Sequence, residues 1–160
     1  MSGILFDRAR SSPDPRWRTI GELVGDAAER FADREFLRFP GASLSFAGAH
    51  AASNRLAHVL IAHGVRPGDR VAIMMGNVPD WPLNWFAIGK AGAVAVPVNA
   101  GYREADLGLV LADSAAVVVL TTDEHAGLVR AAAAACSTTH AGNWRPSRFP
   151  PTWSSWRPSP

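Results

Sequence analysis

The five histidines are the side chains in this sequence best suited to bind a metal ion. No two of them show the HExxH spacing of a helical zinc site, and no cysteine pair accompanies them. We therefore predict no metal ligand, and we expect these side chains at the surface or packed on helix faces. The histidines are His50, His58, His63, His125 and His140.

Nucleophiles and acid/base groups are also sparse. Cys136 is the only cysteine, and no histidine or asparagine partner is evident for it, so we expect neither an intrachain disulfide nor a catalytic thiol. A single cysteine fits a reducing cytoplasm, which is the predicted location. Asp69, Asp106 and Asp113 resemble turn and helix-terminal residues more than an acid/base pair. The sequence therefore predicts no catalytic residue.

Binding of a nucleotide phosphate needs a glycine-rich loop whose backbone amides approach the anion. Lys90 is the only lysine, and it ends the segment 85–90 (WFAIGK), which has the character of a helix rather than of such a loop. No GxGxxG motif follows a predicted strand, which disfavours a small nucleotide-binding protein of Rossmann type. We predict no cofactor-binding residue in this chain.

Aromatic side chains form two groups that need separate interpretations. Trp81, Trp85 and Phe86 are the residue types of an acyl pocket, but aromatics at helical spacing are more often core or subunit-contact residues. A second group, near the end of the chain, has the composition of a surface that stacks on single-stranded nucleic acid, but no folded platform is predicted there. Its members are Trp144, Arg145, Trp153, Trp156 and Arg157. We expect a core or subunit-contact role for the first group and no nucleic-acid partner.

The distribution of charge also argues against nucleic-acid binding. The 160 residues carry a net charge of +2, yet residues 1–136 hold thirteen basic and fourteen acidic side chains, a net charge of −1. The predicted folded part therefore has no basic stripe. Apolar residues make up 48% of the chain, which indicates a globular protein. Neither a secretory signal nor a membrane-spanning run is evident.

The first element expected from the sequence is a helix that begins at Thr19. Thr19 and Glu22 have the spacing of a capping box, and apolar residues repeat at helical spacing behind them as far as Phe31. Residues 1–18 are rich in Arg, Ser, Pro and Asp, and we interpret them as a loose lead-in.

A hairpin and a second helix are expected next. Alternating apolar residues at 37–39 and 44–46 flank a Pro40-Gly41 turn, which predicts two short antiparallel strands. The second helix should run over about 47–63, with Gly64 as its C-terminal stop.

A longer rhythm follows. Apolar runs at 71–75, 93–98 and 116–120 start roughly 22 residues apart, as parallel strands joined by crossover helices do. Helices are expected at 79–90, 104–112 and 123–135. We predict an α/β fold with an open, mainly parallel sheet and flanking helices, over residues 19–136. Residues 137–160 contain five Pro, five Ser, three Trp and three Arg but no acidic residue, and we expect a disordered or extended tail.

The segment 64–73 (GVRPGDRVAI), followed by Asn77, resembles the early part of AMP-forming acyl-CoA synthetases. Further segments that match in order are 92–99 (GAVAVPVN), 102–103 (YR), 106–107 (DL) and 113–114 (DS). With the helix from Thr19 and the strand 44–46, the resemblance covers about residues 19–135. It implies a part of the large N-terminal domain of an adenylating enzyme. Full-length members use ATP, Mg²⁺ and coenzyme A to convert a carboxylic or fatty acid into acyl-CoA, AMP and pyrophosphate.

The sequence also departs from the family pattern. Gly48-Ala49 stands where the family has Glu-Leu, and a glycine inside a helix costs about 1 kcal/mol. The family's Ser/Thr/Gly-rich phosphate loop, which ends in Lys-Gly, is not found, nor are its adenine and hinge motifs or its catalytic lysine. We therefore expect an inactive fragment whose incomplete sheet makes it prone to aggregation.

Two interpretations of the chain stay open at the level of sequence. The change of composition at about Ala135-Cys136 indicates a frameshift or a misjoined reading frame, because wrong-frame translation of a GC-rich gene yields Arg, Pro, Ser and Trp. The alternative to an inactive ligase fragment is a non-catalytic interaction module that docks a partner through an open sheet edge or through the Trp-rich tail, and a small nucleotide-binding protein is the less favoured alternative.

Overall fold

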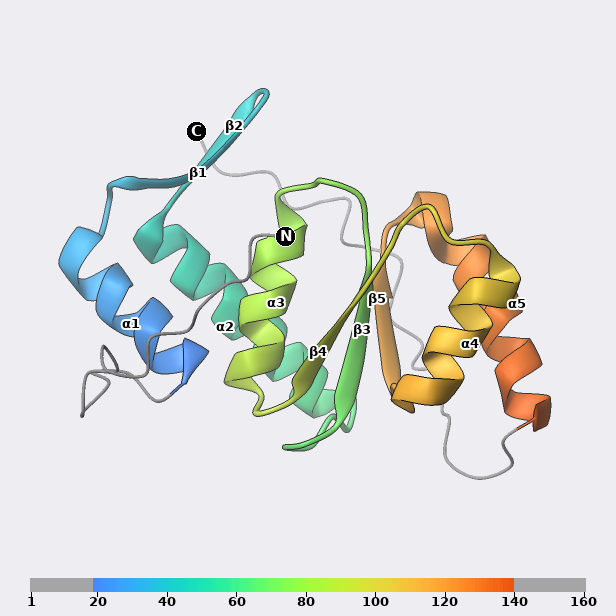
Figure 1. Cartoon of the computed structure of the whole chain (residues 1–160). Helices are drawn as coiled ribbons and strands as arrows, with labels where there is room; N and C mark the ends of the chain where they lie inside the picture. The colour runs from blue at the N-terminus through green and yellow to red at the C-terminus, as the bar shows by residue number, and fades with distance from the viewer. Residues whose placement is uncertain (1–18, 140–160) are drawn as a thin grey trace, which may run out of the picture.

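The computed structural model describes residues 19–139, and these residues adopt the α/β fold that the sequence predicts (Figure 1). The elements in chain order are α1 (Ile20–Phe31), β1 (Glu35–Phe39), β2 (Ala42–Ser45), α2 (Phe46–Ala62), β3 (Arg70–Met74), α3 (Asp80–Lys90), β4 (Val94–Val98), α4 (Glu104–Ser114), β5 (Val118–Thr121) and α5 (Asp123–Thr139). The predicted lead-in 1–18 and residues 140–160 of the predicted tail lie outside the described residues.

The predicted capping box is present at the start of α1. The Thr19 hydroxyl accepts a hydrogen bond from the Glu22 N–H, and the Glu22 carboxylate accepts one from the Thr19 N–H, each at 3.1 Å. This reciprocal pair satisfies backbone donors that have no partner inside the helix. It also fixes the entry of α1 beside α3, where a Cβ on Gly21 would lie 3.4 Å from Lys90 Cγ.

The predicted hairpin leads directly into α2. β1 pairs antiparallel with β2, and Ser45 then caps α2 by accepting a hydrogen bond from the Gly48 N–H at 3.1 Å. Gly48 thus lies in the first turn and not in the helix interior. A Cβ at this position would lie only 2.9 Å from Leu44 Cδ1. The absence of a side chain at residue 48 makes room for Leu44, so the glycine has a packing role that the sequence did not reveal.

The three longer strands form a parallel sheet in the order β4-β3-β5. β3 is central, and residues 71–74 are completely buried. β4 lies at the edge of the sheet and is apolar but only partly buried: Val94 is 50% exposed, and Pro97 is exposed as well. Proline has no N–H to donate to a neighbouring strand and is therefore typical of edge strands.

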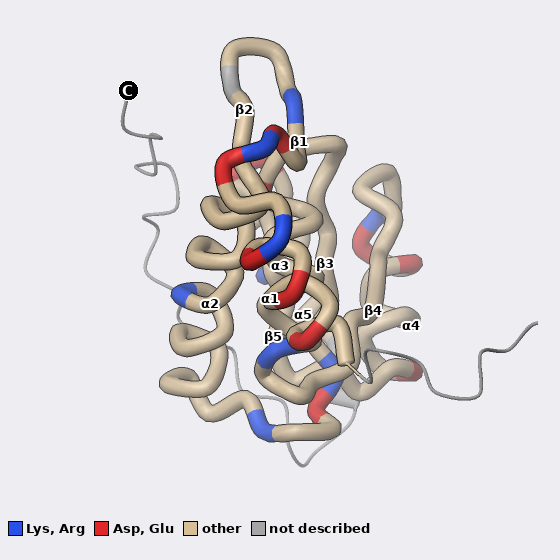
Figure 2. The backbone as a smooth tube through the Cα atoms, turned by 90° about the vertical axis from the view of Figure 1, so that its left-hand side faces the viewer, with Lys and Arg blue, Asp and Glu red and all other residues tan. Residues whose placement is uncertain are grey.

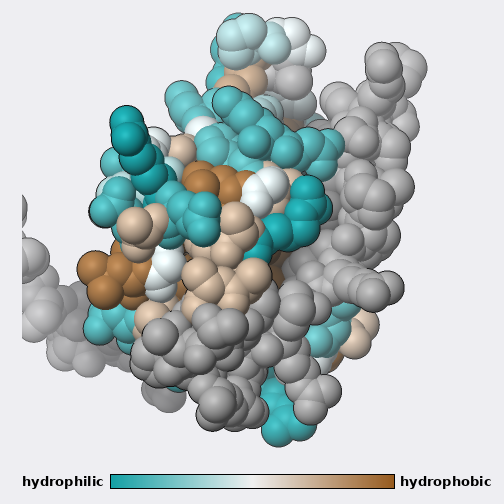
Figure 3. Space-filling view, turned by 90° about the vertical axis from the view of Figure 1, so that its right-hand side faces the viewer, coloured by the Kyte–Doolittle hydropathy of each residue, from teal (hydrophilic) through white to brown (hydrophobic). Residues whose placement is uncertain are grey.

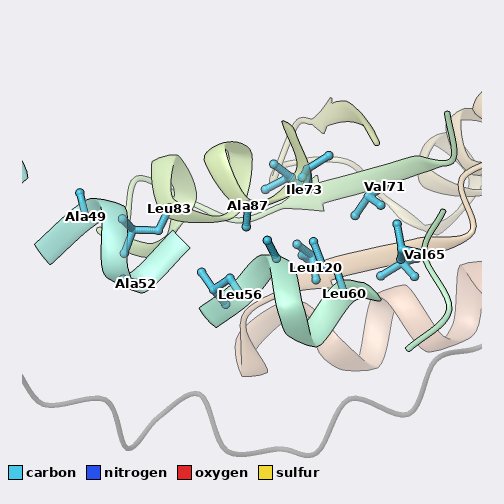
Figure 4. Packing of buried hydrophobic residues seen from close by; sticks show 13 residues of the cluster. Ala49, Ala52, Leu56, Leu60, Val65, Val71, Ile73, Leu83, Ala87 and Leu120 are labelled. Carbon is cyan, nitrogen blue, oxygen red and sulfur yellow. The ribbon is translucent and has the colours of Figure 1, made fainter. Parts of the chain in front are cut away.

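Helices cover both faces of this sheet (Figure 1). On one face α2 and α3 pack against the strands, with α1 outside them. Leu56 and Leu60 of α2 meet Ile73 of β3, Ala87 of α3 and Leu120 of β5 in one buried cluster (Figure 4).

The opposite face is covered by α4 and α5. Met74 of β3 packs there against Leu107 and Leu111 of α4 and Ala132 of α5. Seen from this side, hydrophobic side chains are interspersed with hydrophilic ones at the surface (Figure 3). Leu109, on the outer side of α4, is 72% exposed.

Hydrogen bonds near the start of β3 join the sheet to the segments that connect its strands. Arg70 Nε donates to the Ser114 carbonyl at 2.9 Å, and its Nη2 donates to the Ala115 carbonyl at 3.3 Å. The guanidinium therefore satisfies carbonyls at the C-terminal end of α4 that lack partners within the helix. In the preceding turn, the Gly68 N–H donates to the Gly92 carbonyl at 2.9 Å, and both glycines have positive φ, 86° and 72°.

Helix α5 ends at Thr139, later than the predicted 135. Residues 137–139 therefore continue the helix, although the sequence assigns them to the tail. Their types explain the difference, because no glycine or proline occurs between Gly127 and Gly142 to end the helix earlier.

Candidate functional site

Lys90 ends α3, and its ammonium group lies against α2. Nζ donates to Ser53 Oγ and Asn54 Oδ1 at 2.8 Å each, and to the His50 carbonyl at 3.2 Å. His50 Nδ1 lies 3.3 Å from the same nitrogen. Because an ammonium can only donate, this ring nitrogen is an acceptor, and the neutral imidazole carries its proton on Nε2.

The partners of Lys90 come from one face of α2. His50, Ser53 and Asn54 are three and four positions apart, a spacing that places side chains on the same side of a helix. Ser53 is completely buried, and its hydroxyl donates to the Ala49 carbonyl at 2.7 Å, so its oxygen is free to accept from Lys90. This polar cluster joins α2 to α3 across more than thirty-five positions of sequence.

No carboxylate occurs among these partners of the Lys90 ammonium. Partial burial lowers the pKa of Lys90 to about 8. Burial, and to a smaller extent the charge of Lys90, lower the pKa of His50 below 6.5. At neutral pH the site therefore contains a mostly protonated amine beside a neutral imidazole.

A surface hollow of about 410 Å³ opens at this cluster, between α1, α2 and the end of α3. Its walls combine polar groups, two apolar side chains and three glycines. The lining residues are Thr19, Gly21, Glu22, His50, Asn54, Ala57, His58, Ile61, Gly89, Lys90 and Gly92. The hollow thus brings together two of the histidines and the only lysine, none of which the sequence connected.

The hollow lacks the features of a nucleotide-phosphate site. Its glycines come from different elements and do not form one loop of converging backbone amides. They have a packing role instead: a Cβ on Gly89 would lie 3.3 Å from Ile20 Cβ, so glycine lets α3 approach α1. Four acceptor atoms already surround the three protons of the Lys90 ammonium. The hollow therefore suits a small ligand bound beside the Lys90 amine better than it suits the triphosphate of a nucleotide.

The carboxyl ends of the parallel strands, where ligands of open α/β sheets bind, offer no phosphate loop either. Residues 75–79 (MGNVP) connect β3 to α3 with a single glycine, and residues 99–103 (NAGYR) connect β4 to α4. The Asn99 side chain accepts a hydrogen bond from the Gly101 N–H at 2.9 Å, which is a local turn.

The other predicted candidates are dispersed. His63 Nδ1 lies 2.8 Å from the Val59 carbonyl at the end of α2, and His125 Nδ1 lies 3.0 Å from the Thr122 hydroxyl. Within residues 19–139, no group of three or more His, Cys, Asp or Glu side chains could hold a metal ion. His140 lies outside the described residues, and Cys136 is on α5.

The three aspartates have local positions. The Asp69 carboxylate accepts a hydrogen bond from the Arg66 N–H at 2.8 Å within the turn that precedes β3. Asp106 lies in the first turn of α4 and Asp113 in its last. The structure does not bring any two of them together in a hydrogen bond or an ion pair that would define an acid/base site.

The aromatic residues of α3 contribute to packing. Trp81 packs against the buried cluster under α2, and the Phe86 ring centroid lies 5.8 Å from that of Phe36 on β1. Trp85 is 38% exposed, with its ring centroid 6.5 Å from that of Trp81. The aromatic residues of the predicted nucleic-acid alternative, Trp144 and those after it, lie outside the described residues.

Charged residues show no stripe of one sign along the described trace (Figure 2). The seventeen residues of α2, which form one wall of the hollow, include Arg55 as their only arginine and no lysine or acidic residue. Among residues 19–139, no helix is long and apolar enough to cross a bilayer.

Proteins with similar sequences include CoA ligases and peptide synthetases, among them triostin synthetase I of Streptomyces triostinicus, which is 34% identical over 110 residues, 69% of this chain and 21% of that protein. The sequence profile of the family described as AMP-binding enzyme matches residues 24–153. A feruloyl-CoA synthase of an Amycolatopsis species is 46% identical over 98 residues, which are 61% of this chain and 20% of that protein. A medium/long-chain-fatty-acid–CoA ligase of Mycobacterium tuberculosis is 44% identical over 96 residues, 60% of this chain and 15% of that protein.

Solved structures with the same fold include proteins named as fatty acyl CoA synthetases or parts of them. The N-terminal domain of FACL13 from Mycobacterium tuberculosis has a TM-score of 0.69 and 27% identity, over 82% of this chain and 34% of that one. A fatty acyl CoA synthetase of the same organism gives a TM-score of 0.70 and 27% identity, over 83% of this chain and 27% of that one. The matched part of this chain spans only 20% and 15% of the length of the feruloyl-CoA synthase and the fatty-acid–CoA ligase, respectively.

Proposed function

Since this chain belongs to the AMP-binding enzyme family, we propose that it is part of the large N-terminal domain of an ATP-dependent acyl-CoA ligase. The complete enzyme would join a carboxylic or fatty acid to AMP with release of pyrophosphate, and the thiol of coenzyme A would then displace AMP. The named activities of the relatives, feruloyl-CoA synthase and fatty-acid–CoA ligase, support this reaction class. A single cysteine supports a reducing, cytoplasmic location for the enzyme.

We also propose that these 160 residues alone do not form an acyl-adenylate. The observation that carries this proposal is the placement of the only lysine, because Lys90 Nζ donates to Ser53, Asn54 and His50 and lies on a helix rather than in a phosphate loop. Adenylate formation requires Mg²⁺ and cationic or backbone donors that neutralise the phosphates. ATP, Mg²⁺ and coenzyme A are therefore assigned to the complete enzyme and not to this chain.

A pyrophosphate-release assay on the purified chain tests the proposal. The assay contains ATP, Mg²⁺ and a panel that includes both aromatic and fatty acids, because both classes occur among the names of the relatives. A full-length feruloyl-CoA synthase serves as the positive control. We expect no release above the protein-free blank for this chain. Acid-dependent release that is lost in Lys90→Ala would show that the phosphates bind at Lys90 after all.

We propose in addition that the residues after about 136 are translated from a shifted reading frame. Support comes from the change to a segment rich in Pro, Trp and Arg that has no acidic residue. The family profile extends to residue 153, which an in-frame segment would explain. Translation of the DNA beyond codon 136 in its other frames distinguishes a shifted reading frame from an in-frame segment. A Ser/Thr/Gly-rich motif ending in Lys-Gly supports a frameshift, and featureless alternatives contradict it.

A further inference from the structure

We propose that Lys90 is a nucleophile whose amine accepts acyl groups from acyl thioesters, with His50 as the acceptor of its proton. A covalent modification site of this kind is separate from adenylate formation. It does not depend on the chain making its own activated acid, because a thioester can be supplied from solution.

The geometry of the pair carries the proposal. A nucleophile within hydrogen-bond reach of a neutral base is the arrangement that activates an amine or a hydroxyl. Lys90 Nζ lies 3.3 Å from His50 Nδ1, a ring nitrogen that can accept a proton from the amine when the imidazole carries its own proton on Nε2.

Partial burial favours the neutral amine. The ionisable groups that line the hollow beside Lys90 are Glu22 of α1 and His50 and His58 of α2. The Glu22 carboxylate accepts the hydrogen bond from the Thr19 N–H in the capping box. Partial burial sets the pKa of Lys90 at about 8. About a quarter of the Lys90 amines are therefore neutral at about pH 7.5, against roughly one in a thousand for an ordinary lysine.

The hollow also has room for the product. Its volume is about 410 Å³, and Ala57 and Ile61 give it an apolar wall that suits a short acyl chain. Gly21 lies next to the stem of Lys90 and carries no side chain that would fill this space. A Cβ at residue 21 would lie 3.4 Å from Lys90 Cγ.

The proposed step balances without any further reactant. His50 Nδ1 takes one proton from the Lys90 ammonium, and the neutral amine attacks the thioester carbonyl. The N–C bond forms, the C–S bond breaks, and the sulfur leaves as a thiolate that takes up the second amine proton. The products are an amide at Lys90 and a free thiol, and nothing is oxidised or reduced.

The test uses the fact that Lys90 is the only lysine, so that the chain has one side-chain amine and one N-terminal amine. The 160-residue protein is incubated with S-acetyl-N-acetylcysteamine at about pH 7.5, and acetylation at each amine is measured by peptide mass spectrometry. The same reaction in guanidinium chloride reports the unfolded chain. The fraction of Lys90 amine that is neutral is about 200-fold higher in the folded chain than in the unfolded one. The weaker nucleophilicity of a less basic amine reduces this ratio to roughly tenfold, if amines follow the slope known for thiols.

We expect Lys90 to be acetylated about tenfold faster in the folded protein than in the unfolded one, while the N-terminal amine shows no such difference. His50→Gln keeps a hydrogen-bonding side chain but removes the base, and it should slow the reaction at Lys90 several-fold without changing the far-UV circular dichroism. Lys90→Arg should show acetylation only at the N-terminus. Equal Lys90 rates in the folded and unfolded chains would overturn the proposal, as would an unchanged rate in His50→Gln.

Discussion

Replacing Arg70 by alanine should loosen the end of α4 from the sheet. The guanidinium makes two hydrogen bonds there, a part-buried one from Nε to the Ser114 carbonyl at 2.9 Å and an exposed, longer one from Nη2 to the Ala115 carbonyl at 3.3 Å. Hydrogen bonds from charged donors contribute about 1.5–3 kcal/mol when well formed, and solvent weakens the second one. We therefore expect a loss of about 2 kcal/mol in the free energy of unfolding.

Urea unfolding followed by far-UV circular dichroism measures this loss. With a slope of about 2 kcal/mol per molar urea for a domain of this size, the midpoint of Arg70→Ala should fall by about 1 M. The slope itself should not change, because the same surface is exposed on unfolding. Arg70→Lys retains the charge but not the two-pronged geometry, and it should lose about half as much.

Arg103 provides a matched control, because it is exposed and its side chain makes no capping hydrogen bond at the other end of α4. Arg103→Ala should change the free energy of unfolding by less than about 0.5 kcal/mol. The reasoning is refuted if Arg70→Ala is as stable as Arg103→Ala, because the carbonyls of α4 would then be satisfied equally well by water.

Three further predictions concern packing and charge. Gly92→Ala should cost about 2 kcal/mol, because φ is 72° and the new Cβ would lie 3.2 Å from Pro67 Cβ; thermal unfolding measures the loss. Two leucines of α4 test which face of the helix is buried, because Leu107 is completely buried and Leu109 is 72% exposed. Substitution by alanine should cost about 3 kcal/mol at Leu107 and under about 0.5 kcal/mol at Leu109. Equal costs would contradict this orientation of α4. The pKa of Lys90 is about 8 in the folded chain and 10.5 without burial, so the unfolded chain binds more protons between these values. The free energy of unfolding should therefore rise as the pH increases from about 8 to 10.5, and this gain is lost as the pH falls back through 8. After allowance for solvent exposure the change amounts to about 1 kcal/mol. Lys90→Met should remove this dependence on pH.

Local patterns in the sequence predicted much of the fold. The capping box at Thr19 and Glu22 depends on residues three apart, and the structure contains both of its hydrogen bonds. The spacing of the apolar runs predicted the three parallel strands, because each strand and crossover helix reflects its own periodicity.

Features that depend on distant neighbours were not predictable in the same way. The exposure of β4 follows from its place at the edge of the sheet, which its apolar residues do not reveal, although Pro97 was an available signal. The cluster of Lys90, His50, Ser53 and Asn54 needs the packing of α3 on α2, and no pattern within either helix specifies it. The sequence indicated only that Lys90 belongs to a helix.

The most direct test of the account is whether this chain can form an acyl-adenylate in a single turnover. The protein is held in excess over α-labelled ATP with Mg²⁺ and either ferulic acid or a fatty acid, and hydroxylamine traps any activated acyl group as a hydroxamate. We expect no labelled AMP and no hydroxamate above the protein-free control. Stoichiometric formation of both would contradict this expectation, and would mean that the described fold binds and orients ATP without a phosphate loop.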